Sequence, residues 1–135
     1  MVIHVGVSHL ANCLTLEECA VVNKQRYISP DVNNVCLSPA INPDDQLVHL
    51  KTGLNIDQIV KRINNLNASG NLPITAVKST KAGEYLCEYI YRCSLKKNNQ
   101  RSLFVHVPQL SSTVTPELLG KGLNAIIEII IELYL

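Results

Sequence analysis

Residues 74–107, ITAVKSTKAGEYLCEYIYRCSLKKNNQRSLFVHV, contain the pattern that decides the fold. The segment opens with a short β-branched run, 74–77, and closes with a longer, mostly apolar run, 102–107, that Pro108 ends, and both runs are typical of strands. Between them, apolar residues recur at the spacing of an amphipathic helix, which Asn98 and Asn99 end. A strand, a helix and a second strand in this order predict a right-handed crossover and a parallel sheet covered by helices.

The helix inside this segment carries a cysteine in a specific place. We expect Ser79 or Thr80 to cap the helix. Its apolar stripe contains Tyr85, Leu86, Tyr89, Ile90 and Cys93, which predicts a core position for Cys93. Cys87 lies beside that stripe, four residues after Gly83, and helical side chains lean toward the amino end of the helix. The sequence therefore predicts an accessible thiol over a glycine, near the positive end of the helix.

The remaining segments extend the same α/β pattern. The run VIHVGV, 2–7, predicts a buried parallel strand, and LTLEECAVV, 14–22, predicts a second strand. Residues 23–55 are rich in Asn, Pro, Asp and Ser and indicate a loop with one short strand, within 33–41 or 46–52.

Two further helices have clear start signals. A helix over 56–67 is predicted, capped by Asn55, with inward residues Ile56, Ile59, Val60, Ile63 and Leu66. The last helix should begin at Thr115 and Pro116, with Thr at the cap and Pro in the first turn.

Composition limits the classes of function. The 135 residues are 47% apolar and 17% charged with a net charge of +1, which suits one α/β domain over 1–135. This balance, without a basic run, excludes nucleic acid and anionic membranes as predicted partners. The apolar end, 122–135, is too short to span a bilayer, and Asn124, Glu128 and Glu132 form a polar stripe on it. Its apolar face is expected to pack on the fold or against another subunit, which would make a homo-oligomer.

The five cysteines indicate free thiols in a reducing compartment, the cytosol. They are an odd set without a CxxC motif or a secretory signal: Cys13, Cys19, Cys36, Cys87 and Cys93. A zinc site could be drawn from Cys13, Cys19, Cys36 and His9, but the spacing fits no usual ligand pattern. A redox pair of Cys87 and Cys93 is disfavoured because six residues along one helix are too far apart for a disulfide.

Three side chains suited to thiol chemistry fall at predicted carboxyl ends of strands, where parallel sheets gather functional groups. Cys87 follows the strand 74–77, His106 ends the strand 102–107, and Glu17 follows the loop after the strand 2–7. A helix amino end and an imidazolium lower the pKa of a thiol, and a carboxylate orients the imidazole. The alternative interpretation is equally simple. A cysteine in a helix is usually a small apolar residue and a strand histidine a hydrogen-bonded one. That interpretation is the expected one for His4 and His49, and Asp44 and Asp45 are expected in a solvated turn.

Three stretches of the chain resemble the motifs of one family, in that family's order. The cysteine motif is similar at Ser79, Ala82, Gly83, Tyr85, Leu86 and Cys87, and the glutamate motif at Gly6, Thr15 and Glu17. The stretch FVHVPQL, 104–110, resembles the strand that bears the family histidine, which falls on His106. The family is pyroglutamyl-peptidase I, and the similarity runs from Met1 to the end of the chain.

The resemblance implies a three-layer α/β/α fold with a mostly parallel sheet, and an activity that removes N-terminal pyroglutamate from peptides in the cytosol. It implies no metal and no cofactor. Cys87 is then the nucleophile, His106 the general base and later the acid, and Glu17 the residue that orients the histidine. The reaction would pass through an acyl-thioester that water hydrolyses.

The chain also departs from the family pattern. Members of the family begin earlier, with a strand and a Gly-Phe-Gly-x-Phe loop, so the first strand and loop are expected to be missing here. Unusual residues stand at Lys78, Lys81, Glu88, His9 and Glu18, and the stretch NNVCLSP lacks the family's arginine. The second hypothesis is therefore a truncated, catalytically silent relative that acts as a binding or structural protein.

Overall fold

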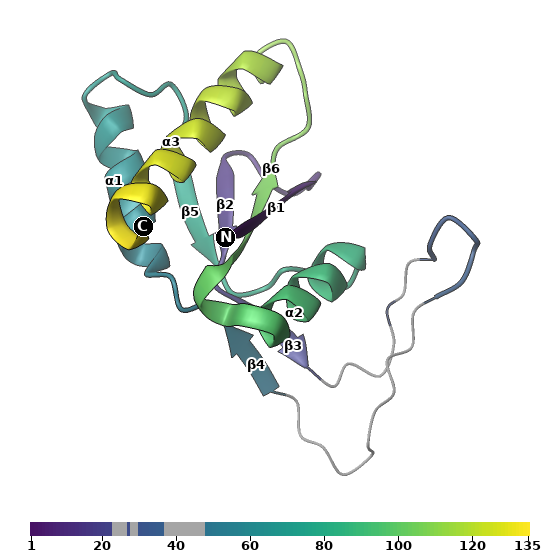
Figure 1. Ribbon diagram of the computed structural model, residues 1–135. Helices are drawn as coiled ribbons and strands as arrows, with labels where there is room; N and C mark the ends of the chain where they lie inside the picture. Colours follow the sequence, from purple (N-terminus) through teal and green to yellow (C-terminus); the bar gives the residue numbers. More distant parts are fainter. Residues whose placement is uncertain (23–26, 28–29, 37–47) are drawn as a thin grey trace. The chain divides into compact units, whose positions relative to one another are not determined.

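The computed structural model describes residues 1–22, 27, 30–36 and 48–135 of the chain. Figure 1 shows its strands and helices along the sequence. They are β1 (Val2–Val7), β2 (Leu14–Glu17), β3 (Cys19–Val22), β4 (Val48–Lys51), α1 (Ile56–Ala68), β5 (Ala76–Ser79), α2 (Leu86–Asn98), a 3₁₀ turn (Asn99–Arg101), β6 (Ser102–Val107) and α3 (Pro116–Tyr134).

The strands form two sheets. The larger sheet has the order β1-β6-β2-β5, and β3 pairs with β4 in a separate antiparallel sheet. The strands β2 and β5 run parallel, because the N–H of Leu14 donates to the carbonyl of Thr75 and the N–H of Glu18 donates to that of Ser79. A mostly parallel, mixed sheet with helices confirms the predicted α/β class.

The described chain divides into two compact units. Unit 1 contains residues 1–4, 17–54 and 79–103, and unit 2 contains residues 5–16, 55–78 and 104–135. The division passes through all four strands of the larger sheet, so each unit holds a part of each strand. That the 135 residues form one domain stays a prediction.

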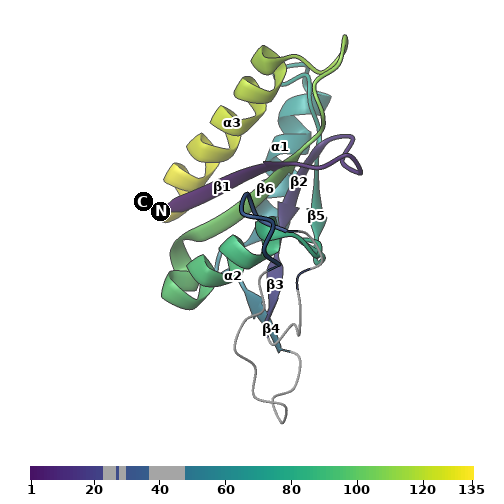
Figure 2. The same cartoon turned by 90° about the vertical axis from the view of Figure 1, so that its right-hand side faces the viewer.

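Unit 2 contains the two helices with clear start signals, and both predictions are confirmed. The side chain of Asn55 accepts from the N–H of Gln58 at 3.0 Å and begins α1. Thr115 accepts from the N–H of Leu118 at 3.2 Å and begins α3, with a proline in the first turn. The two helices pack side by side (Figures 1 and 2) and are joined by an ion pair between Arg62 and Glu132.

The helix α3 is buried on one face only. Its interior side contributes Ala125, Ile126, Ile129 and Ile130 to the core, whereas Ile127 and Ile131 are 42% and 51% exposed. No helix among the described residues is long and apolar enough to cross a bilayer. Whether a second subunit covers the exposed isoleucines stays a prediction.

Unit 1 contains α2, which packs against β3 (Figure 2) and differs from its prediction in two ways. The helix begins at Leu86 after an extended Tyr85, without a side-chain cap, so the expected cap at Ser79 or Thr80 is wrong. The reason is local: Ser79 ends β5, and Gly83 adopts a φ of 100° that a right-handed helix cannot contain.

The buried face of α2 is also not the predicted one. Its buried residues are Glu88, Tyr91, Arg92 and Leu95. Of the predicted stripe, Tyr85, Leu86 and Ile90 are 48%, 39% and 47% exposed. Cys93, predicted in the core, is exposed. Apolar periodicity selected the wrong face because two ionisable side chains lie on the buried one.

Three strand predictions need correction. The run 14–22 is two strands, because β2 joins the larger sheet and β3 pairs with β4. The strand predicted at 74–77 is shifted to Ala76–Ser79. The predicted buried strand 2–7 is found at its predicted bounds as β1, but among the described strands it ends the order and has one neighbour, and its valines are exposed.

The long loop region is described in part. The strand β4 confirms the second of its two predicted strand positions, 46–52. In the first, 33–41, only residues up to Cys36 are described, and Cys36 forms an isolated bridge with Pro30. The expected solvated turn at Asp44 and Asp45 lies outside the described residues.

Candidate functional site

Glu17 is the last residue of β2 and is almost completely buried, with 2% of its surface exposed. Its main-chain carbonyl accepts a hydrogen bond of 2.8 Å from the hydroxyl of Tyr91 on α2. The chain turns out of the larger sheet directly after this residue, because β3 belongs to the smaller sheet. The main chain of this buried residue, at the end of a strand, is thus held by the helix that carries Cys87.

Cys87 is the second residue of α2 and lies in its first turn, after Tyr85 at the N-cap. The main-chain N–H groups of a first turn have no partner within the helix and carry partial positive charge. The thiol is half-buried and not, as predicted, laid over a helical Gly83, because Gly83 precedes the helix. The predicted position near the positive end of the helix is confirmed.

The surroundings of Cys87 within unit 1 change its predicted acidity. Burial raises the pKa of the Cys87 thiol, the residue's own main-chain N–H lowers it, and the Glu17 carboxylate raises it further. The helix end lowers the pKa of this thiol as predicted, but burial and the Glu17 carboxylate outweigh it, so the net direction within unit 1 is upward. The thiol is therefore mostly protonated at neutral pH and requires a base to become a nucleophile. The further lowering expected from an imidazolium stays a prediction.

Four hydrogen bonds tie the segment of Glu17 to the segment of Cys87. They run from the Tyr91 hydroxyl to the Glu17 carbonyl at 2.8 Å, from the Glu18 N–H to the Ser79 carbonyl at 2.7 Å, from the Cys19 thiol to the Thr80 carbonyl at 3.3 Å, and from the Val21 N–H to the Glu88 carboxyl at 2.7 Å. Each joins residues at least 61 positions apart in the sequence. The structure thus joins the chain segments that carry two of the three predicted site residues, Glu17 and Cys87, by hydrogen bonds between their neighbours.

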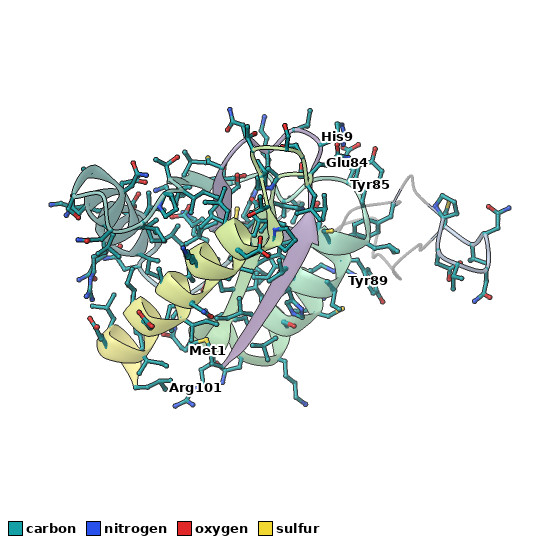
Figure 3. All side chains as sticks on the ribbon, turned by 90° about the horizontal axis from the view of Figure 1, so that it is seen from above. Met1, His9, Glu84, Tyr85, Tyr89 and Arg101 are labelled. Carbon is teal, nitrogen blue, oxygen red and sulfur yellow. The ribbon has the colours of Figure 1, made fainter. Side chains whose placement is uncertain are left out.

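A buried cluster on α2 was not predicted from the sequence. Arg92 is 6% exposed, and its guanidinium carbon lies 5.1 Å from the centre of the Tyr89 ring and 5.9 Å from that of Tyr27. The two tyrosine rings meet edge to face at 5.5 Å. The four-residue spacing of Glu88 and Arg92 is the one sequence signal that could have indicated it, since such pairs share a helix face. Figure 3 shows Glu84 and Tyr85 at the start of α2 and Tyr89 further along it.

His106 belongs to unit 2 and lies on β6, a strand whose six residues are all buried. It is 9% exposed, and its ring centre lies 4.7 Å from that of Phe104, tilted by 48°. Residues two apart on a strand share a face, so this contact follows from the sequence. Because Cys87 and Glu17 belong to the other unit, the predicted approach of Cys87 and His106 stays a prediction.

The other histidines predicted to be structural have partners in unit 1. His4 Nε2 lies 2.7 Å from Ser94 Oγ, and His49 Nδ1 lies 3.5 Å from the Cys19 sulfur. Where the chain is described, no three His, Cys, Asp or Glu side chains are close enough to hold a metal ion.

The sequence is similar to named peptidases. It is 34% identical over 133 residues to human pyroglutamyl-peptidase 1, covering 98% of this chain and 61% of that protein. The rat protein of the same name is 34% identical over 128 residues, covering 95% and 58%. The human pyroglutamyl-peptidase 1-like protein is 30% identical over 138 residues, covering 98% and 63%. The chain thus spans about three fifths of the length of these relatives.

Solved structures that resemble this fold are also peptidases. A pyrrolidone carboxyl peptidase of Pyrococcus furiosus aligns with a TM-score of 0.73 at 25% identity, covering 96% of this chain and 68% of that one. The pyrrolidone carboxyl peptidase of Fervidobacterium islandicum aligns with a TM-score of 0.72 at 23% identity, over 96% and 68%, and shows the fold. No protein-family model matches the chain. The chain is therefore a relative of pyroglutamyl-peptidase 1 in sequence and shares the fold of the pyrrolidone carboxyl peptidases.

Proposed function

We propose that this chain acts as a cysteine peptidase that removes pyroglutamate from the amino terminus of peptides. Cys87 is the nucleophile, His106 the general base and then acid, and Glu17 the residue that orients the histidine. The observation that carries the proposal is the framework of four hydrogen bonds around Glu17 and Cys87, in a relative of pyroglutamyl-peptidase 1.

The raised pKa of Cys87 makes the base a requirement of the mechanism. His106 takes the proton from the thiol, and the sulfur attacks the carbonyl carbon of the pyroglutamyl residue. The carbon–nitrogen bond to the next residue breaks, and the leaving amine takes the proton from the imidazolium. His106 then takes a proton from a water molecule, and the hydroxide attacks the carbonyl carbon of the thioester. The carbon–sulfur bond breaks, pyroglutamate is released, and the imidazolium of His106 returns the proton to the sulfur of Cys87.

The proposed substrate and compartment follow from chemistry. Pyroglutamate is a lactam without a free amine, so a site for it needs few polar groups and a closed apolar wall. The five cysteines are unbridged thiols in the structure, which supports a reducing compartment, the cytosol.

The test is the hydrolysis of pyroglutamyl-aminomethylcoumarin by the purified chain, with prolyl-aminomethylcoumarin as the substrate that carries a free amine. We expect release of the fluorophore from the first substrate and not from the second. The variant Cys87→Ala should abolish the reaction. Cys93→Ala, which removes an exposed thiol from the same helix, should leave the rate within about twofold, as for surface changes.

The result also separates the two hypotheses for this chain. A rate that survives Cys87→Ala would contradict the proposed nucleophile. A folded chain that binds pyroglutamyl peptides but hydrolyses none would instead support a catalytically silent binding protein. The sequence feature in favour of that second function is the stretch NNVCLSP, 33–39, which lacks the family's arginine.

A further inference from the structure

We propose that Tyr91 is a positioning residue for the reaction: its hydroxyl holds the main chain of Glu17 so that the Glu17 carboxylate stays beside the Cys87 thiol. The inference rests on the proposed function, because it assigns Tyr91 a role within that same site. It also predicts that Tyr91 affects the pKa of the Cys87 thiol, which can be measured without any peptidase activity.

The geometry connects the two residues through one rigid element. Tyr91 lies four residues after Cys87 on α2, so the two side chains share a helix face. Tyr91 is completely buried, and its hydroxyl donates to the carbonyl of Glu17 at 2.8 Å. A single helical turn and a single hydrogen bond therefore link the thiol-bearing residue to the main chain of Glu17.

The hydrogen bond acts where the chain changes sheets. Glu17 ends β2, and the next residue already makes contacts outside that strand: the Glu18 carbonyl accepts from the N–H of Thr52 at 2.9 Å. The direction in which the Glu17 side chain leaves the strand depends on how this junction is held. Tyr91 supplies the bond to the carbonyl of Glu17 itself, whereas the other three bonds of the framework end on residues 18, 19 and 21.

The Tyr91 hydroxyl stays a donor at every pH at which the site could work. Burial raises the pKa of Tyr91 far above its ordinary value, and a hydrogen bond with Thr52 lowers it only in part. The acidic groups that face it are Cys19, Glu17 and Glu18, and each raises the pKa further. The bond to Glu17 is therefore not lost by titration of the phenol in the assay range.

The test measures the alkylation of Cys87 by iodoacetamide across pH, read by peptide mass spectrometry, in four proteins. They are the unchanged chain, Tyr91→Phe, Glu17→Gln and the double variant. Because the Glu17 carboxylate raises the pKa of Cys87, Glu17→Gln should lower the pH midpoint of alkylation. If Tyr91 acts through Glu17, Tyr91→Phe should lower the midpoint in the unchanged chain and have no effect in the Glu17→Gln background.

The control is Tyr89→Phe, which removes the same atom from the same helix. Within the described part of the chain, the Tyr89 hydroxyl has no hydrogen-bond partner, so this variant should leave the midpoint unchanged. In the pyroglutamyl assay, Tyr91→Phe should lower kcat about twofold to tenfold, as expected for one hydrogen bond, with KM unchanged.

Two results would overturn the inference: a Tyr91→Phe variant that loses thermal stability but keeps the midpoint of Cys87, or a shift of the same size in the Glu17→Gln background. Circular dichroism checks that each variant is folded. If the unchanged chain hydrolyses no pyroglutamyl substrate, the proposed function fails, but the four alkylation midpoints still decide whether Tyr91 positions Glu17.

Discussion

Two glycines on α3, two residues apart, provide a direct test of how this helix packs in unit 2. A β-carbon added at Gly122 would lie 2.7 Å from Leu14 Cδ1 and 2.9 Å from Ile74 Cγ2, both inside van der Waals contact. A β-carbon added at Gly120 would meet no atom within 4 Å. Both residues are within the helix, so alanine gains the same helix propensity at either position.

The expected magnitudes follow from these distances. Replacing glycine by alanine inside a helix stabilises it by about 1 kcal/mol, and Gly120→Ala should show this gain in full. At Gly122 the same gain is opposed by overpacking, which costs about 1 to 3 kcal/mol in a close-packed core. Leu14 is fully buried and has little room to move away. The two variants should therefore differ by about 1 to 3 kcal/mol in the free energy of unfolding, with Gly122→Ala the less stable.

Urea denaturation followed by circular dichroism measures this difference directly, and thermal denaturation gives a second value. For a chain of this length, 1 kcal/mol corresponds to a change in Tm of about 3 to 5 °C. If Gly122→Ala is as stable as Gly120→Ala, then α3 does not approach Leu14 and Ile74 as closely as the structure places it, and the reasoning is refuted.

Two further predictions concern unit 1. Glu88→Ala removes a buried carboxyl that accepts a part-buried hydrogen bond from the N–H of Val21, and it should lower the free energy of unfolding by about 2 to 3 kcal/mol in urea denaturation. Glu84→Ala, at an exposed position of the same segment, should change the free energy of unfolding by less than about 0.5 kcal/mol. Equal effects would contradict the packing of α2 on β3. Burial raises the pKa of Tyr27 to about 12 and also raises that of Tyr91, so the folded chain keeps protons that the unfolded chain releases. The free energy of unfolding should therefore fall as pH rises above about 10, by up to about 1.4 kcal/mol per pH unit for each group, and a flat profile in urea denaturation between pH 8 and 11 would show that these phenols are not buried.

Local signals in the sequence were sufficient where a single residue type determines the backbone. Asn55 and Thr115 cap their helices as predicted, because the capping side chain and the donor it satisfies are three residues apart. The strand 102–107 has its predicted bounds, since a short apolar run that Pro108 ends has few alternatives. These elements depend on their nearest neighbours in the chain and not on the rest of the fold.

The failed predictions depend on contacts between distant segments. The run 14–22 contains no turn residue, and it divides into two strands only because β3 pairs with the distant β4. The exposure of β1 depends on its place at the end of the strand order, which its composition does not reveal. For the site, residue types indicated Cys87 and Glu17, but the hydrogen bond from Tyr91 joins positions 74 residues apart and leaves no local pattern.

The error in the buried face of α2 also explains the error in the acidity of Cys87. Successive residues of a helix are about 100° apart around its axis. The predicted face centres on Leu86 and Tyr89, and Cys87 then lies well over 90° from its centre, toward solvent. The observed face centres on Leu95, between Tyr91 and Arg92, and Cys87 lies at its margin, about 80° away. This rotation places the thiol where burial and the Glu17 carboxylate both raise its pKa. The helix end cannot offset them alone, so a reactive Cys87 depends on a base, and His106 is the proposed one.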